Sequence, residues 1–131
     1  LEIYRNPATT FVAGFIGNPP MNFVLAHAVE DGVFEALGHR LNGPRGHQSL
    51  TLGVRPEDLH ADTEGFGIDV AVVEPLGAHT LVTAFAGEPR QVFRAALDSA
   101  QTYHAGQRLR LRPDTTRVRW YDNAGHMIAH A

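Results

Sequence analysis

The sequence has no cysteine and no lysine among its 131 residues, and serine occurs at only two positions. The absence of cysteine excludes disulfide bonds, a thiolate nucleophile and a cysteine-based metal site. Without lysine, the chain cannot form the usual phosphate-binding P-loop. Neither Ser49 nor Ser99 lies in a G-x-S-x-G sequence, so the nucleophile elbow of many hydrolases is also missing.

Long apolar runs and a strong charge bias are absent too. No run approaches the length needed to span a membrane, and a net charge of −3 gives no reason to expect nucleic acid as a partner. Eight histidines are present, but the only close pair is His126 and His130. On the strand expected there, these two lie about 13 Å apart. We therefore predict no metal site, no cofactor and no catalytic residues.

The first 17 residues carry the one convincing helical pattern. Asn6 is a good N-cap, Pro7 suits the first helical position, and Gly17 with the following prolines ends the pattern. The apolar side chains recur at helical spacing and form one stripe: Phe11, Val12, Phe15 and Ile16. A helix this short needs a packing partner. We expect the chain to be a piece of a longer protein, with this helix at a seam between two domains.

After Met21 the pattern changes to short β-rich runs separated by glycine, proline, asparagine and aspartate. The expected strands are 22–30, 33–37, 48–54, 68–74, 80–86, 91–96, 108–112, 117–121 and 127–129. Many short strands at such spacing predict a barrel or a sandwich. Residues 97–106 are polar and are expected to form a loop or a short turn.

Arginines alternate along the last long strands, which places them on one face. Arg108, Arg110 and Arg112 lie on one predicted strand, and Arg117 and Arg119 on the next. A hairpin of these strands would carry up to five guanidinium groups on one side. Such a face binds anions or nucleic acid, or it is a solvated face paired with carboxylates. The favoured partners lie in an arginine-free acidic stretch: Asp58, Asp62, Glu64, Asp69 and Glu57.

A weak internal repeat links two turns. Gly53-Val54-Arg55-Pro56-Glu57 is similar to Arg110-Leu111-Arg112-Pro113-Asp114, and each is a strand that enters an Arg-Pro-acid turn. Proline fixes φ and ends ladder pairing, and the acid can cap the turn. The repeat either marks two related small barrels or arose by chance.

Several blocks, in order, resemble one known family. They are Leu-Glu-Ile-Tyr at 1–4, Asn-Pro-Ala at 6–8, the run 11–17, Met-Asn-Phe at 21–23, Leu-Gly-Val-Arg-Pro-Glu-Asp-Leu at 52–59, Val-Val-Glu-Pro-Leu-Gly at 72–77 and Tyr-Asp at 121–122 with Gly125. Together they resemble the C-terminal part of importer-type ABC ATP-binding subunits. The closest resemblance is to the carbohydrate and glycerol-phosphate uptake group, which includes the maltose transporter ATPase.

The resemblance implies an all-β, OB-like barrel of the TOBE type with a short N-terminal helix. Residues 1–17 would be the tail helix of an absent ATPase domain, with its apolar stripe packed on that domain, and residues 18–131 the barrel. ATP and magnesium would be bound by the absent domain, so this chain would not catalyse hydrolysis. The implied partners are a second copy, membrane permease subunits and a regulatory protein or small molecule, in the cytoplasm at the inner membrane.

The resemblance also transfers contact positions onto this sequence. Regulatory or dimer contacts would lie at three turns, which contain Arg55 and Glu57, Glu74 and Gly77, and Tyr121 and Asp122. Related molybdate-type TOBE domains bind oxyanions. The second hypothesis is therefore a small-oxyanion-binding module that uses Arg108, Arg110 and Arg112. Nucleic acid is not expected as a partner.

Overall fold

Two antiparallel β-sheets make up the described part of the protein. The structure, a computed structural model, describes residues 20–128. Within them it forms β1 (Asn22–Glu30), β2 (Val33–Ala36), β3 (His39–Asn42), β4 (Ser49–Val54), the 3₁₀-helix η1 (Pro56–Asp58), β5 (Leu59–Asp62), β6 (Phe66–Pro75), β7 (His79–Ala86), β8 (Gln91–Asp98), β9 (Arg108–Pro113) and β10 (Arg119–Tyr121). The all-β, OB-like prediction is confirmed. The predicted helix at 1–17 lies outside the described residues.

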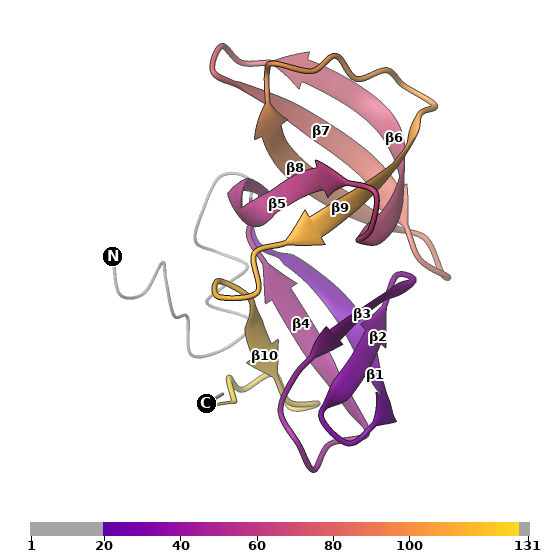
Figure 1. The fold of residues 1–131 in the computed structure, drawn as a ribbon, viewed down its shortest axis with the longest axis vertical. Helices are drawn as coiled ribbons and strands as arrows, with labels where there is room; N and C mark the ends of the chain where they lie inside the picture. Colours follow the sequence, from indigo (N-terminus) through magenta and orange to yellow (C-terminus); the bar gives the residue numbers. More distant parts are fainter. Residues whose placement is uncertain (1–19, 129–131) are drawn as a thin grey trace.

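The strands form two five-stranded sheets that lie end to end (Figure 1). The first sheet has the order β10-β4-β1-β2-β3, and the second has the order β5-β9-β6-β7-β8. The chain crosses between them twice, from β4 through η1 to β5 and from β9 to β10. The whole second sheet is therefore inserted between two neighbouring strands of the first.

Two strands were not expected from the sequence, and one predicted hairpin is wrong. β3 and β5 are four residues each and carry mostly exposed, polar side chains, so their apolar pattern is weak. The predicted hairpin of the arginine strands does not form, because β9 pairs with β5 and β6 whereas β10 pairs with β4. Residues 114–118 lead the chain away to the other sheet instead of turning back on β9.

Alternation along the strands builds a main core that extends across both sheets. Val24 and Ala26 on β1 point inward, and Leu25 between them points outward. The indole ring of Trp120 on β10 packs against Phe34 on β2, with 4.9 Å between ring centroids. In the second sheet the edge strands β5 and β8 contact each other, so the sheet curls toward a closed barrel.

Asn22 joins the two sheets. Its side-chain amide donates to the carbonyl of Arg94 on β8 (2.8 Å) and to that of Val54 on β4 (3.2 Å). Its side-chain oxygen accepts the backbone N–H of Arg94 at 2.8 Å. The carboxamide thus bonds to Arg94 as a neighbouring strand would, and Asn22 is buried in doing so. Both backbone groups of Arg94 are satisfied through a residue of the other sheet.

Candidate functional site

The two crossings between the sheets run beside each other. After β4, Arg55 is buried, and its carbonyl accepts the N–H of Asp58 at 3.0 Å to close η1. After β9, the N–H of Asp114 donates to the carbonyl of Asp58 at 2.8 Å. Both crossings therefore meet at Asp58, and both start with the Arg-Pro-acid sequence that the internal repeat picked out.

The second crossing is stabilised by its own carboxylate. Asp114 accepts the backbone N–H of Thr116 (3.0 Å) and the hydroxyl of Thr116 (2.7 Å). These hydrogen bonds hold the pKa of Asp114 below its usual range. Asp114 therefore serves the turn itself, and its carboxylate is committed to local backbone geometry.

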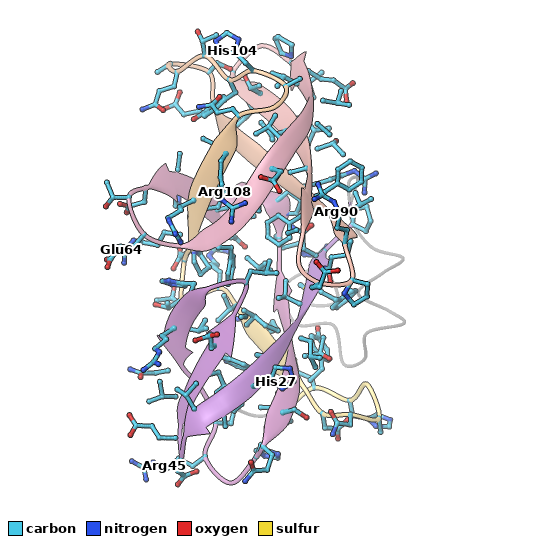
Figure 2. All side chains as sticks on the ribbon, turned by 90° about the vertical axis from the view of Figure 1, so that its right-hand side faces the viewer. His27, Arg45, Glu64, Arg90, His104 and Arg108 are labelled. Carbon is cyan, nitrogen blue, oxygen red and sulfur yellow. The ribbon has the colours of Figure 1, made fainter. Side chains whose placement is uncertain are left out.

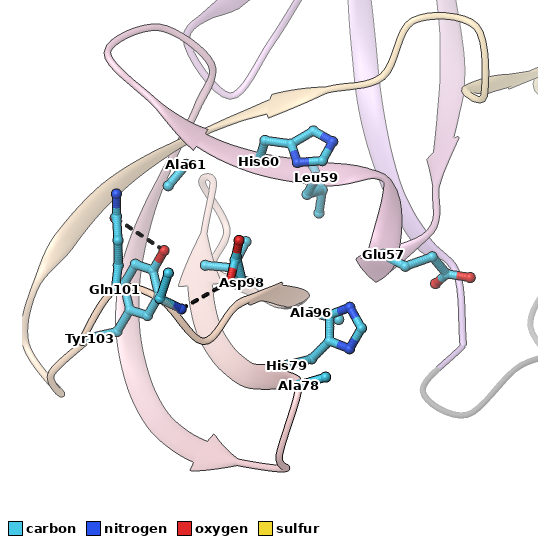
Figure 3. Close-up of a pocket in the computed structure, with 12 residues that line it drawn as sticks. Glu57, Leu59, His60, Ala61, Ala78, His79, Ala96, Asp98, Gln101 and Tyr103 are labelled. Carbon is cyan, nitrogen blue, oxygen red and sulfur yellow. Dashed lines mark hydrogen bonds between the residues drawn. The ribbon is translucent and has the colours of Figure 1, made fainter.

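Glu57 lies on the surface of the first crossing, beside a hollow between β5 and the β7–β8 pair (Figure 3). The hollow has a volume of about 490 Å³. His60, His79 and Asp98 line it with several alanines, and the Tyr103 hydroxyl at its far side lies 3.3 Å from Gln101 Oε1. Burial raises the pKa of the Tyr103 phenol.

The β6–β7 turn forms the adjoining surface. Leu76 is 63% exposed, and Gly77 adopts a φ of +87°, which favours glycine. The Ser99 hydroxyl donates to the Gly77 carbonyl at 2.7 Å and fixes the turn. A second hollow of about 620 Å³ lies between this turn and η1, and Glu57 and His79 line both hollows.

The Tyr121-Asp122 pair contributes to the fold. Tyr121 is 0% exposed and packs edge-on against Phe23, with 5.9 Å between ring centroids. Burial raises its pKa, and the positive charges of Arg55 and Arg119 partly offset that effect. Asp122 accepts the N–H groups of Ala124 and His126, each at 2.9 Å, which lowers the pKa of Asp122.

These positions divide the predicted contact residues into two groups. Arg55 and Tyr121 are buried, and Asp122 is committed to its turn, so the described structure gives these three a packing or turn role. Glu57, Glu74 and Gly77 are exposed, and of these three only Glu57 lines the second hollow. Glu74 pairs with Leu81 and Gly77 follows Leu76, and both of these neighbours line it. Three of the six predicted contact residues are therefore exposed at this hollow or next to its lining.

The arginine face of β9 is present and is largely paired with carboxylates. Arg112 contacts Asp62 at 2.8 Å and Glu64 at 3.0 Å, and Arg108 contacts Asp69 at 3.0 Å. Arg110 reaches the Gly65 carbonyl at 3.5 Å. The acid-pairing interpretation is confirmed for Arg108 and Arg112, and the predicted five-arginine face is wrong because Arg119 lies in the other sheet.

Sequence reasoning missed Asn22 and Arg90, which also lie at important positions. The hydrogen-bond partner of Asn22 on β8 is 72 residues away, so no local pattern reveals it. Arg90 lies 3.7 Å from the same Asp69 that Arg108 contacts, although it belongs to the β7–β8 turn. Within residues 20–128 no three metal-ligating side chains cluster, and no helix is long and apolar enough to cross a membrane.

Two models of known families match this chain, one over the first strands and one over the rest of the described residues up to β10. The model "TOBE domain" matches residues 52–120, from β4 to β10, and "MalK OB fold domain" matches residues 17–59. The chain belongs to the TOBE domain family. The two matches overlap at the first crossing, so the TOBE assignment covers the entire second sheet and both crossings.

Curated relatives of this TOBE chain carry transporter names. Proteins named sn-glycerol-3-phosphate import ATP-binding protein UgpC are similar to it in several organisms, three of which are compared below. The Ruegeria pomeroyi protein is 50% identical over 84 residues, covering 63% of this chain and 24% of its own. The Bordetella avium protein is 32% identical over 133 residues, covering 93% and 37%.

The Cereibacter sphaeroides protein is 38% identical over 125 residues, covering 92% of this chain and 35% of its own. The chain therefore spans well under half the length of these relatives. By name they are import ATP-binding proteins, and in the Bordetella avium and Cereibacter sphaeroides proteins the similarity extends over more than nine-tenths of this chain.

Proposed function

We propose that this chain is the accessory domain of the ATP-binding subunit of an ABC importer, where it holds two subunits together and receives regulatory signals. The support is the TOBE match together with relatives that are named import ATP-binding proteins. ATP and magnesium would be bound by an ATPase domain outside this chain. Catalysis would take place in that domain, on which the apolar stripe of residues 11–16 would pack.

The observation that carries the proposal is the exposed surface around Glu57, Glu74, Leu76 and Gly77. We call these residues the turn surface. Two rigid turns meet there around a largely apolar hollow, and Leu76 stands out into solvent. An apolar centre with a charged rim is typical of a protein contact site. The turn surface is where a second subunit or a regulatory protein would bind.

The names of the relatives support a candidate cargo. They specify sn-glycerol-3-phosphate, and the proposed cargo of this chain's transporter is therefore glycerol-3-phosphate or a sugar. Membrane permease subunits would contact the ATPase domain, and the assembly would lie on the cytoplasmic side of the inner membrane. Purified transporter reconstituted in vesicles, with uptake measured for glycerol-3-phosphate and for maltose, would test the cargo; failure to take up either would contradict it.

Dimerisation is tested by sedimentation velocity on the 131-residue chain. We expect a concentration-dependent dimer, and Leu76→Asp should weaken it by about tenfold because a charge would enter the centre of the contact. Leu25→Asp is the matched control, since Leu25 is a similarly exposed leucine (55%) on β1 of the other sheet. A monomer at high concentration would contradict the dimer. If both variants weakened the dimer equally, the contact would not lie on the turn surface.

A further inference from the structure

A charged hollow of about 470 Å³ lies where the two sheets meet, at a different place from the turn surface. The tip of the β2–β3 hairpin forms one wall, and β6, β9 and the β7–β8 turn form the others. Arg90, Arg108 and Arg110 all line it. Figure 2 shows Arg90 and Arg108 at a similar height in the upper half of the molecule, whereas Arg45 lies at its lower end. Three guanidinium groups from two separate segments therefore converge on one small volume.

The charges in the hollow do not cancel. Asp69 contacts Arg108 at 3.0 Å and Arg90 at 3.7 Å, and Glu88 is the other carboxylate in the lining. The Arg110 side chain has no carboxylate partner among the described residues, and the only hydrogen bond of its guanidinium there is the long one to the Gly65 carbonyl (3.5 Å). The lining thus carries one more positive than negative charge.

Two of the arginines are held in place by neighbouring groups. The Arg90 guanidinium lies over the ring of Phe85, 5.2 Å from its centroid, in a cation–π contact. The Arg108 guanidinium lies against β6 at Gly67, where a Cβ atom would come within 2.9 Å of Nη2. Glycine at this position leaves the space that the guanidinium occupies.

The hairpin tip is strained where it borders the hollow. Leu37 has a φ of +48°, which is costly for a residue with a branched apolar side chain. Its carbonyl accepts the N–H of Gly67 at 3.0 Å, so the strained turn is bonded to β6. Strained backbone of this kind clusters at ligand sites. The tip of the first sheet is therefore fixed at the edge of the arginine hollow.

We propose that this hollow binds a phosphate group, either inorganic phosphate or the phosphate of a small ester. Guanidinium groups bind tetrahedral oxyanions through paired, charge-assisted hydrogen bonds, and three of them favour a dianion over a monoanion. The site replaces the predicted set Arg108, Arg110 and Arg112, because Arg112 is already paired with two carboxylates. A bound phosphate would connect the β2–β3 tip to the second sheet.

Nuclear magnetic resonance titration of the 131-residue chain tests the proposal. Inorganic phosphate and glycerol-3-phosphate are added separately, with sodium chloride at equal ionic strength as the control. We expect saturable shifts at the backbone amides of Gly67, Gly87 and Arg108 with at least one phosphate compound and none with chloride. Saturation by phosphate identifies the free ion as a ligand, and saturation by the ester alone identifies the ester. Shifts that chloride reproduces would overturn the site.

Charge variants distinguish phosphate binding in this hollow from nonspecific attraction of anions to the protein surface. Arg110→Gln should weaken binding by about fivefold, since one partly solvated charge is removed. Asp69→Asn should tighten binding, because it removes the carboxylate that competes for Arg108 and Arg90. Arg45→Gln is the matched control, as Arg45 is an exposed arginine paired with Asp31 at the far end. Equal weakening by Arg110→Gln and Arg45→Gln, or weakening by Asp69→Asn, would overturn the proposal.

The outcome of the phosphate titration is independent of whether the chain dimerises. The hollow is lined by none of the turn-surface residues, so a chain that dimerises and binds no phosphate refutes only this inference. A chain that binds phosphate as a monomer refutes only the dimer.

Discussion

The two crossings share an Arg-Pro-acid sequence and use it in opposite ways. Arg55 is 4% exposed in the first crossing, whereas Arg112 in the second is exposed and paired with Asp62 and Glu64. The acid of the first crossing, Glu57, points to solvent beside a hollow (Figure 3), and the acid of the second, Asp114, caps its own turn. One sequence pattern therefore supplies a buried cation in one place and a surface cation in the other.

The difference arises from the strand that precedes each proline. Residues 52–56 are buried in a continuous run, because β4 is an inner strand of the first sheet and leads directly into η1. β9 instead alternates between exposed and less exposed positions, with Arg112 on its outer face. The position of the strand in the sheet decides the role of the arginine. A repeated motif is thus weak evidence for a repeated function.

The largest expected change in stability tests whether the first crossing depends on the hydrogen bonds by which Asn22 joins the two sheets. Asn22→Ala removes the hydrogen bond to Val54, which precedes Arg55, and both bonds to Arg94. We expect the free energy of unfolding to fall by about 3 kcal/mol, because buried backbone groups lose their partners. Urea unfolding measures it, with Asn42→Ala on exposed β3 as control. If both variants lowered the free energy of unfolding equally, the hydrogen bonds of Asn22 would not stabilise the contact between the sheets.

The next effect compares the two arginines directly. Arg55→Ala should cost about 2–3 kcal/mol of unfolding free energy, since a buried side chain and its packing are lost. Arg112→Ala should shift the urea midpoint far less, and the shift should fade in about 1 M salt, because salt screens exposed ion pairs. If the two variants were equally destabilised at high salt, the contrast between buried and exposed roles would be wrong.

The smallest effect concerns the acid of the second crossing. The pKa of Asp114 is lowered in the folded state, so its stabilising contribution is present above the pKa of the unfolded chain and is lost as pH falls through the folded-state value. Asp114→Asn should therefore reduce the loss of stability below about pH 4. Thr116→Val, which removes only the hydroxyl donor, should reduce it less. Urea midpoints at neutral and acidic pH measure the loss of stability for each variant. If the midpoints of the variants and of the unmodified chain fell equally with pH, Asp114 would not stabilise its turn.

The sequence predicted the fold class and most strands, because their apolar alternation is local. It failed at β3 and β5, whose inward side chains are few, and at the pairing of β9. Adjacent strands joined by a short turn usually form a hairpin, but β10 finds its partner in β4, more than 60 residues earlier. Such long-range pairing depends on both sheets being present, and no segment of sequence encodes it alone.

The candidate sites were predictable to a smaller extent. Glu57, Glu74 and Gly77 were found through family resemblance; the structure leaves all three exposed, with Glu57 in the lining of the second hollow and the other two beside residues that line it. Arg108 and Arg110 were found from their alternation. Arg90 was not found, because it joins them only through the folding of the β7–β8 turn against β9. Residues that share a face of one strand can be inferred from sequence, whereas residues from different strands that share a pocket cannot.

The insertion of the second sheet between β4 and β10 has a consequence for synthesis on the ribosome. All five strands of the second sheet lie in one continuous segment, so they can pair as soon as residue 113 leaves the exit tunnel. The first sheet must wait for β10, whose Trp120 covers Phe34. A nascent chain stalled before residue 119 would then expose the core of the first sheet, so this sheet, although four of its strands are synthesised earlier, would become resistant to proteases after the second.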